Sequence, residues 1–104
     1  MSRPTRLEDV VIQSWVTAHP KWRLEDGHLI REVTTIDYPS GARLIQAQVP
    51  LAERLNHHPI VTFGYRIVRF ELWTHDQRGL TQLDVDFAEG LEVLLAGEFA
   101  AFVV

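Results

Sequence analysis

The chain lacks cysteine, an excess of basic residues and any long apolar run. Without cysteine it can form no disulfide, no thiolate metal site and no cysteine nucleophile. Ten Lys and Arg stand against 14 Asp and Glu, so the net charge is −4 and a surface that follows phosphate backbones is not expected. No apolar run approaches the roughly 18 residues that span a bilayer, and residues 1–6 do not resemble a secretory signal. We therefore expect a cytoplasmic protein that binds neither nucleic acid nor membrane.

The composition is that of an ordinary globular protein. Hydrophobic residues make up 46% of the chain and charged residues 23%. A chain of 104 residues is long enough for one modest core and too short for two. The sequence contains no internal repeat, low-complexity segment or linker. We predict a single domain over residues 1–104.

The first part of the chain predicts a helix followed by a hairpin. Thr5-Arg6-Leu7-Glu8 has the spacing of a capping box, and His19-Pro20 should end the helix because the residue before a proline disfavours helical geometry. Asp26-Gly27 is a strong two-residue hairpin turn, and Tyr38-Pro39-Ser40-Gly41 should break the second strand. The apolar residues at helical spacing in the first helix are Leu7, Val10, Val11, Trp15 and Ala18.

The second part repeats the pattern of a helix and two strands, then adds a helix. Apolar residues at helical spacing predict a helix over residues 44–55, in which Pro50 should introduce a kink or a division. Residues 60–65 can form a short strand, and residues 66–74 alternate as a half-buried strand does. Thr81 and Asp84 have the spacing of another capped helix start.

This order of elements predicts an α+β fold. The order α-β-β-α-β-β-α indicates a four-stranded antiparallel sheet with helices packed on one face. The apolar tail at residues 99–104 either packs on the domain or forms an oligomer contact.

Three of the five histidines gather near two carboxylates in the middle of the sequence. The histidines are His57 and His58, in Glu53-Arg54-Leu55-Asn56-His57-His58-Pro59, and His75, in Thr74-His75. The carboxylates are Glu53 and Asp84. Histidine has an ordinary pKa close to neutrality, so such a group can supply proton donors and acceptors to one pocket. On a helix, a carboxylate four residues before a histidine shares its face and can orient the ring. The pattern indicates an acid–base site.

Two other interpretations of these histidines stay open on spacing alone. The three can cap helix ends or lie as satisfied core histidines. Neutral imidazoles together with Glu53 or Asp84 can also bind zinc or iron, although the adjacent His57 and His58 point in different directions and His-Glu-x-x-His spacing is missing. His19 and His28 are isolated in the sequence, so we expect a surface or turn position for each.

At these positions the chain resembles the pterin-4a-carbinolamine dehydratase family. The family motif is an acidic residue, three residues, His-His-Pro, an aromatic residue six positions after the proline, a histidine ten positions later and then an aspartate. The family fold is also α-β-β-α-β-β-α. In this sequence the motif positions are Glu53, His57, His58, Pro59, Tyr65, His75 and Asp84, with Thr74 directly before the last histidine.

The resemblance implies dehydration of 4a-hydroxytetrahydropterin to quinonoid dihydropterin, without a metal or organic cofactor. This reaction recycles the pterin that aromatic amino acid hydroxylases use. The resemblance implies acid–base work for His57 and His58 at the 4a-hydroxyl, and pterin binding with proton transfer for His75. Glu53 and Asp84 would orient the imidazoles. Thr74, Pro59 and Tyr65 would complete the substrate site, the tyrosine by shaping the pocket or core.

The resemblance also implies a second possible role. The family includes a dimerisation cofactor of a homeodomain transcription factor, and dehydratase-like proteins of carboxysome-bearing bacteria serve as RuBisCO assembly factors. Val61 and Phe63 stand where many members carry Trp and Asn, so a non-enzymatic protein that binds a protein client stays open. In either case we expect a homodimer or homotetramer, because hydrophobic edge strands and tails usually need covering.

Overall fold

The computed structural model describes residues 5–104, and residues 1–4, which belong to the segment tested above for a secretory signal, lie outside it. Three helices, four strands and a short 3-10 helix follow one another in the predicted order, so the predicted α+β fold is confirmed. The elements are α1 (Asp9–Ala18), β1 (Trp22–Glu25), β2 (His28–Thr34), α2 (Tyr38–Leu55), β3 (Ile60–Gly64), β4 (Ile67–Leu72), η1 (His75–Gln77) and α3 (Gln82–Ala96). In the described part of the chain no helix is long and apolar enough to cross a membrane.

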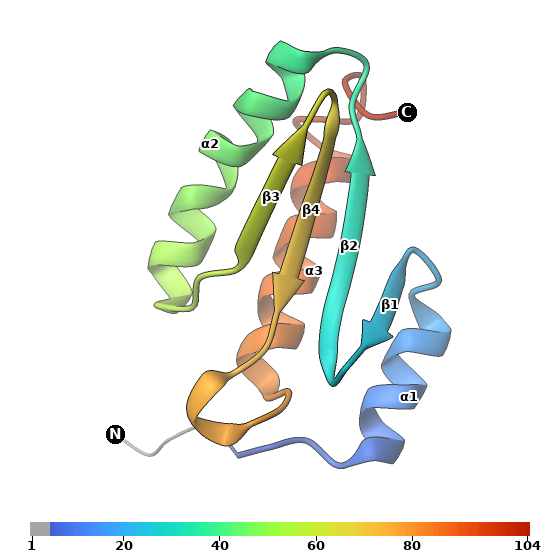
Figure 1. The fold of residues 1–104 in the computed structure, drawn as a ribbon, viewed down its shortest axis with the longest axis vertical. Helices are drawn as coiled ribbons and strands as arrows, with labels where there is room; N and C mark the ends of the chain where they lie inside the picture. Colours follow the sequence, from blue (N-terminus) through green and yellow to red (C-terminus); the bar gives the residue numbers. More distant parts are fainter. Residues whose placement is uncertain (1–4) are drawn as a thin grey trace.

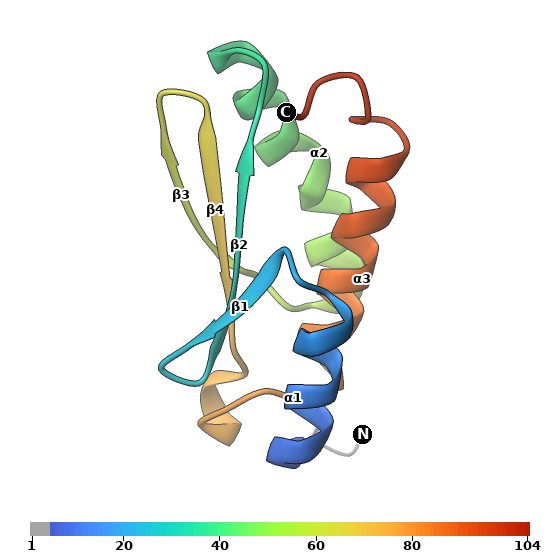
Figure 2. The same ribbon diagram turned by 90° about the vertical axis from the view of Figure 1, so that its right-hand side faces the viewer.

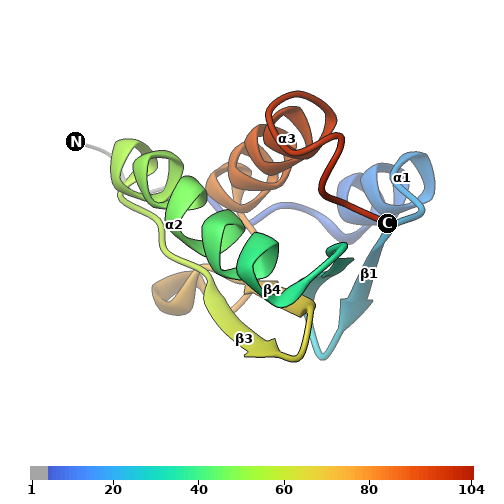
Figure 3. The same ribbon diagram turned by 90° about the horizontal axis from the view of Figure 1, so that it is seen from above.

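The helices and the sheet form two layers (Figure 1). The strand order is β1-β2-β4-β3, and every neighbouring pair is antiparallel. Figure 2 shows the three helices on one face of the sheet, and Figure 3 shows the same two layers from above. The other face of the sheet has no helix over it in the described residues. The predicted packing of helices on one face is therefore confirmed.

Alternation along β4 separates the core from this open face. Val68, Phe70 and Leu72 are buried and belong to the same apolar cluster as Phe87 of α3. Each fully buried side chain of this size contributes about 1.5–3 kcal/mol relative to its exposed state. The intervening residues of β4 project from the open face, because side chains alternate along a strand. The half-buried strand predicted over residues 66–74 is thus confirmed, with bounds of Ile67–Leu72.

The start of α1 differs from the prediction. Glu8 is the N-cap residue and makes no side-chain capping bond, so the capping box predicted from Thr5 is wrong. The residues before the helix pair with a distant segment instead, since Arg6 forms a β-bridge with Thr81. The predicted apolar stripe is wrong in part, because Val10 is 70% exposed. Two members of the predicted stripe, Leu7 just before the helix and Trp15 within it, do pack against the core, together with Ile12 and Val16.

The bounds of α2 also differ from the prediction. β2 ends before the segment that was expected to break it, and this segment also begins the helix. The Asp37 carboxylate accepts the Ser40 backbone N–H at 2.8 Å, and Pro39 lies in the first turn, where its missing N–H costs nothing. Pro50 lies inside the helix and does not divide it. At the other end, Asn56 adopts the left-handed conformation (φ 48°, ψ 46°) and ends the helix directly before the histidines.

The apolar tail packs on the end of β2, so the first of its two predicted roles is confirmed. Phe99 is buried in the core cluster. The Val104 N–H donates to the Thr34 carbonyl at 2.8 Å, and the Ile36 N–H donates to the Phe102 carbonyl at 2.9 Å. These two bonds continue the sheet beyond β2 with the last residues of the chain.

Candidate acid–base site

His57 is positioned by the end of α2. After the left-handed Asn56, the His57 backbone N–H still donates to the Ala52 carbonyl at 3.0 Å, which fixes the direction in which the chain leaves the helix. The imidazole is largely buried and reaches the first turn of α3, where Nε2 lies 2.6 Å from Oδ1 of Asp84. Two residues 27 positions apart in the sequence are thus in direct contact.

Asp84 is held by the capping box at the start of α3. Its carboxylate is completely buried, and Oδ2 accepts both the Thr81 backbone N–H at 2.9 Å and the Thr74 hydroxyl at 2.7 Å. The Thr81 hydroxyl accepts the Leu83 N–H at 3.3 Å and lies 2.7 Å from the Thr74 hydroxyl. Because the Thr74 hydroxyl donates its proton to Asp84, the Thr81 hydroxyl must donate to Thr74. The predicted capped start of α3 is confirmed.

This network assigns the two nitrogens of His57. Carboxylate oxygens only accept hydrogen bonds, so Nε2 of His57 carries the proton that Asp84 accepts. In the neutral ring Nδ1 is then the nitrogen with a free lone pair. The buried carboxylate therefore fixes both the orientation of the ring and the nitrogen that can exchange a proton with a ligand.

His58 pairs with Glu53 on the surface. Its Nε2 lies 2.5 Å from Oε2 of Glu53, and the two side chains are 54% and 68% exposed. The spacing of four residues had predicted that Glu53 would orient His57. That pairing is wrong, because the helix ends at Leu55 and the turn at Asn56 carries His57 toward α3. Each histidine of the pair thus has its own carboxylate.

His75 reaches the same end of the sheet on η1. Its side chain is exposed, and its ring centroid lies 6.4 Å from that of Trp73 at an angle of 57°. The Thr74 N–H donates to the Gly79 carbonyl at 2.8 Å, which closes the loop that contains η1. Since the Thr74 side chain bonds Asp84, the loop of His75 and the ring of His57 are joined through one carboxylate. Half-buried Pro59 follows the two adjacent histidines and leads into β3.

Tyr65 is not brought to this group. It lies in the turn between β3 and β4, at the far end of β3 from His58 (Figure 1), and is 74% exposed. Its backbone φ is +54°, as the tight turn requires, and its ring contacts the Arg66 guanidinium at 5.4 Å. The prediction that Tyr65 shapes the core is wrong. β3 ends at Gly64, so the alternation that places Phe63 against α2 does not extend to Tyr65, which lies in solvent at the turn.

Sequence reasoning missed two features beside these residues. Thr81 was predicted as a helix cap only, although its hydroxyl also bonds Thr74. His28 was predicted to be isolated, but its Nδ1 lies 2.6 Å from Glu71 and its ring stacks on Trp73. The register of β2 against β4 would reveal this contact, because it sets His28 opposite position 73. That register is not readable from the sequence alone.

A family model matches most of the chain. The family model for pterin 4 alpha carbinolamine dehydratase matches residues 5–94, which include every residue of the site. The chain belongs to this dehydratase family. Three relatives carry provisional names as pterin-4-alpha-carbinolamine dehydratases. The Metallosphaera sedula protein is 38% identical over 70% of this chain and 76% of its own. The Natronomonas pharaonis protein is 37% identical over 86% and 95%, and the Chloroflexus aurantiacus protein 30% over 86% and 97%.

A solved structure has the same fold as this dehydratase-family chain. The crystal structure of a transcriptional coactivator/pterin dehydratase from Brucella melitensis superimposes with a TM-score of 0.81 and 25% sequence identity. The superposition covers 86% of this chain and 98% of the Brucella chain. The resemblance drawn from the motif and the fold drawn from the order of elements are both confirmed.

Residues 5–104 contain no metal cluster, and one cleft lies away from the three histidines. Within residues 5–104, no three His, Asp or Glu side chains gather as a metal site requires, so nothing in the geometry favours the metal interpretation. A cleft of about 460 Å³ lies between β2, α3 and the last residues, but it contains none of the three histidines of the predicted site. Its Arg31 is occupied, donating to Glu92 at 2.8 Å. The predicted independence from a cofactor stays a prediction.

Proposed function

We propose that this protein dehydrates 4a-hydroxytetrahydropterin to quinonoid dihydropterin by histidine acid–base catalysis. One observation carries the proposal: His57 is oriented by the buried Asp84 carboxylate, so that one ring nitrogen is fixed as a donor and the other is left for a ligand. Membership of the dehydratase family supports the substrate class.

The reaction needs two proton movements and no redox step. The bond between C4a and the hydroxyl oxygen breaks, and that oxygen gains a proton and leaves as water. A ring nitrogen loses its proton as the carbon–nitrogen double bond forms. One acid and one base in the same pocket can do both, and each contributes about 10²–10⁴-fold in rate.

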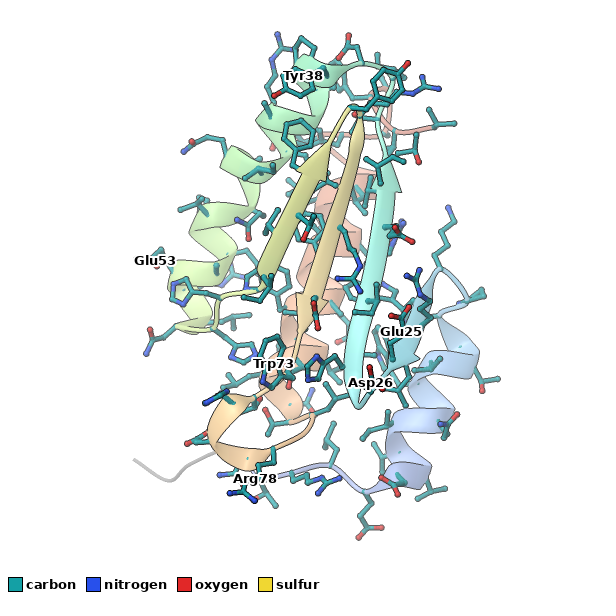
Figure 4. All side chains as sticks on the ribbon, viewed as in Figure 1. Glu25, Asp26, Tyr38, Glu53, Trp73 and Arg78 are labelled. Atoms are coloured by element: carbon teal, nitrogen blue, oxygen red, sulfur yellow. The ribbon has the colours of Figure 1, made fainter. Side chains whose placement is uncertain are left out.

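The arrangement suggests a division of roles. His57 exchanges a proton through Nδ1 while Asp84 holds Nε2 and stabilises the imidazolium when it forms. His58, held by Glu53 in a solvated pair, assists at the 4a-hydroxyl. His75 lies on the separate loop of η1 and serves pterin binding and proton transfer from the opposite side. Figure 4 shows Tyr38 at the top of the molecule, Glu53 near mid-height and Trp73 below it.

The test is a kinetic assay with the 4a-carbinolamine. We expect the wild-type protein to accelerate dehydration above the uncatalysed rate, and His57→Ala and His75→Ala each to remove most of the acceleration. His19→Ala is the matched control: this histidine lies directly after α1 and its Nδ1 contacts the Trp15 carbonyl, away from the site. A wild-type rate equal to the uncatalysed rate would refute the proposal.

The non-enzymatic role is the second candidate. The name of the Brucella protein joins a transcriptional coactivator to a pterin dehydratase. In this chain, exposed apolar side chains along α1 support a contact with a protein client, since Val10 and Val11 are 70% and 48% exposed. The three relatives are named for the dehydratase, so the enzyme is the leading proposal and a RuBisCO assembly role stays a prediction. A Val10→Lys variant that keeps dehydratase activity would show that this surface of α1 is distinct from the acid–base site.

We also propose that the protein self-associates. β3 is at the edge of the sheet, and its first residue, Ile60, is 51% exposed. An uncovered apolar edge strand is a ready surface for pairing with a second copy. Light scattering on the protein as it elutes from a size-exclusion column at micromolar concentration should give a molar mass that is a multiple of 12.0 kDa. A mass of one chain under these conditions would contradict the proposal.

A further inference from the structure

His28 and Trp73 form a stacked pair on the open face of the sheet. The register of β2 against β4 pairs Leu29 with Leu72, so one further step sets His28 opposite Trp73. The two rings meet face to face, with centroids 4.1 Å apart and planes 5° from parallel. The pair therefore joins two strands whose residues are 45 positions apart in the sequence.

The His28 ring is fixed by a second contact. Its Nδ1 lies 2.6 Å from the Glu71 carboxylate, and Glu71 accepts from Arg69 at 3.0 Å. Arg69 in turn lies 3.5 Å from the Glu25 carboxylate. The Glu71 carboxylate, itself paired with Arg69, thus holds the edge of the imidazole, and the Trp73 indole packs on its face. Neither ring of the stack can turn without losing a contact.

Trp73 lies beside the acid–base site. Its other aromatic neighbour is His75, whose ring is 6.4 Å away. The next residue after the tryptophan is Thr74, which bonds the carboxylate that orients His57. The half-buried indole therefore stacks on His28 and neighbours His75, a residue of the proposed pterin site.

We propose that Trp73 is a specificity-determining residue of this site, forming an aromatic wall against which the flat pterin ring lies, and that His28 is its positioning residue. This inference rests on the proposed dehydratase function. It adds a substrate contact from the open face of the sheet and a positioning contact from β2, a strand that contributes no other residue to the site.

Chemistry favours a pterin at such a wall. A pterin is a planar bicyclic ring with the size and polarity of a nucleobase, and stacking on an aromatic side chain strengthens nucleobase binding about 5–150-fold per ring. A wall of this kind holds substrate without moving protons. Its loss should therefore raise KM while kcat stays close to the wild-type value.

The chain contains a matched control for this stack. Trp15 and His19 form a second tryptophan–histidine stack, with centroids 3.9 Å apart, at the end of α1. That stack contacts none of the residues of the site. A purely structural role for stacked indoles would make both pairs respond alike, whereas a substrate wall would make only the Trp73 pair affect KM.

The experiment measures KM and kcat for Trp73→Leu, Trp73→Phe, His28→Gln, Trp15→Leu and His19→Gln. We expect Trp73→Leu to raise KM about tenfold, and Trp73→Phe to restore most of the affinity because it keeps an aromatic face. His28→Gln retains an amide donor for Glu71 but no ring, and should raise KM by a smaller factor. The two control variants should keep the wild-type KM. Circular dichroism checks that each variant folds, and His28→Gln provides the test if Trp73→Leu does not.

A second measurement separates this inference from the proposed function. Calorimetry follows binding of a 7,8-dihydropterin, which has no 4a-hydroxyl to lose. Activity in the wild type with an unchanged KM in Trp73→Leu and His28→Gln overturns the inference alone. An inactive wild type whose dihydropterin affinity falls in Trp73→Leu overturns the dehydratase function and supports the wall. A wild type that neither reacts nor binds overturns both.

Discussion

The buried carboxylate of Asp84 joins the start of α3 to the imidazole of His57. One oxygen accepts the Thr81 backbone N–H at 2.9 Å as part of a helix cap, and the other lies 2.6 Å from Nε2 of the histidine. The group that stabilises the fold therefore also orients the ring. A change that disturbs one of these roles must disturb the other.

Asp84→Asn should separate shape from charge at this position. The amide has the same size, but it can no longer stabilise an imidazolium, and one of its two positions donates instead of accepting. We expect kcat for carbinolamine dehydration to fall by roughly 10²–10⁴-fold, the range of a general acid or base. Steady-state kinetics measure the loss.

The control for this variant is Asp86→Asn on the same helix. Asp86 is exposed and accepts a hydrogen bond from the Gln82 side chain, at 2.9 Å. It should keep the wild-type kcat. If Asp84→Asn also retains the wild-type kcat, the negative charge beside His57 is not needed for the reaction.

Local patterns in the sequence predicted the parts of the fold that depend on neighbours in the chain. The Thr81 and Asp84 spacing identified a real capping box, and the alternation at Val68 and Phe70 identified the central strand. Thr5 and Glu8 have a similar spacing and form no cap. In this segment Arg6 forms a β-bridge with Thr81, and this tertiary contact overrides the local preference for a capping box at Thr5.

The partners within the site could not be predicted in the same way. Glu53 has the helical spacing to meet His57, yet it meets His58, because a single left-handed residue redirects the chain. The stack of His28 on Trp73 depends on the register between two strands, which a sequence pattern does not determine. Motif spacing therefore indicated which residues gather and did not indicate which of them touch.

Glu53→Gln should have little effect on stability. Both members of the Glu53–His58 pair are more than half exposed, and exposed ion pairs contribute about 0–1 kcal/mol. We expect the free energy of unfolding in urea to change by less than about 1 kcal/mol. The loss of kcat should be smaller than that of Asp84→Asn, because solvent screens the charge of the exposed Glu53 whereas Asp84 is buried. A larger loss than in Asp84→Asn would make His58 the main acid–base residue.

Glu71 should make the stability of the protein depend on acid pH. The hydrogen bond from His28, followed by that from Arg69, holds the pKa of the Glu71 carboxyl below its usual range. A lowered pKa stabilises the fold fully above the ordinary glutamate pKa of about 4.3, and that contribution is lost as pH falls through the folded value. Wild type should therefore be more stable than Glu71→Gln at pH 7, and the difference should shrink below about pH 4.3.

Urea unfolding at a series of pH values measures this difference. Glu89→Gln is the matched control, since Glu89 is an exposed carboxylate on α3. Its difference from wild type should stay nearly constant across the series. A gap between wild type and Glu71→Gln that is equally wide at pH 7 and pH 3.5 would show that the pair with His28 does not stabilise the ionised carboxyl.

Pro50→Ala should stabilise the protein, because Pro50 is exposed and lies inside α2. Proline supplies no N–H for the carbonyl four residues earlier, and its ring crowds that carbonyl, at a cost of about 3 kcal/mol relative to alanine in a helix interior. Proline also restricts the unfolded chain, which offsets up to about 1 kcal/mol. We expect the free energy of unfolding to rise by about 1–3 kcal/mol in urea titrations.

Pro39→Ala is the control: Pro39 lies in the first turn of the same helix, where no such bond is lost, so its replacement should change stability by less than about 1 kcal/mol. If Pro50→Ala is no more stable than wild type, α2 accommodates the proline without strain, and the missing hydrogen bond is replaced by solvent at this exposed position.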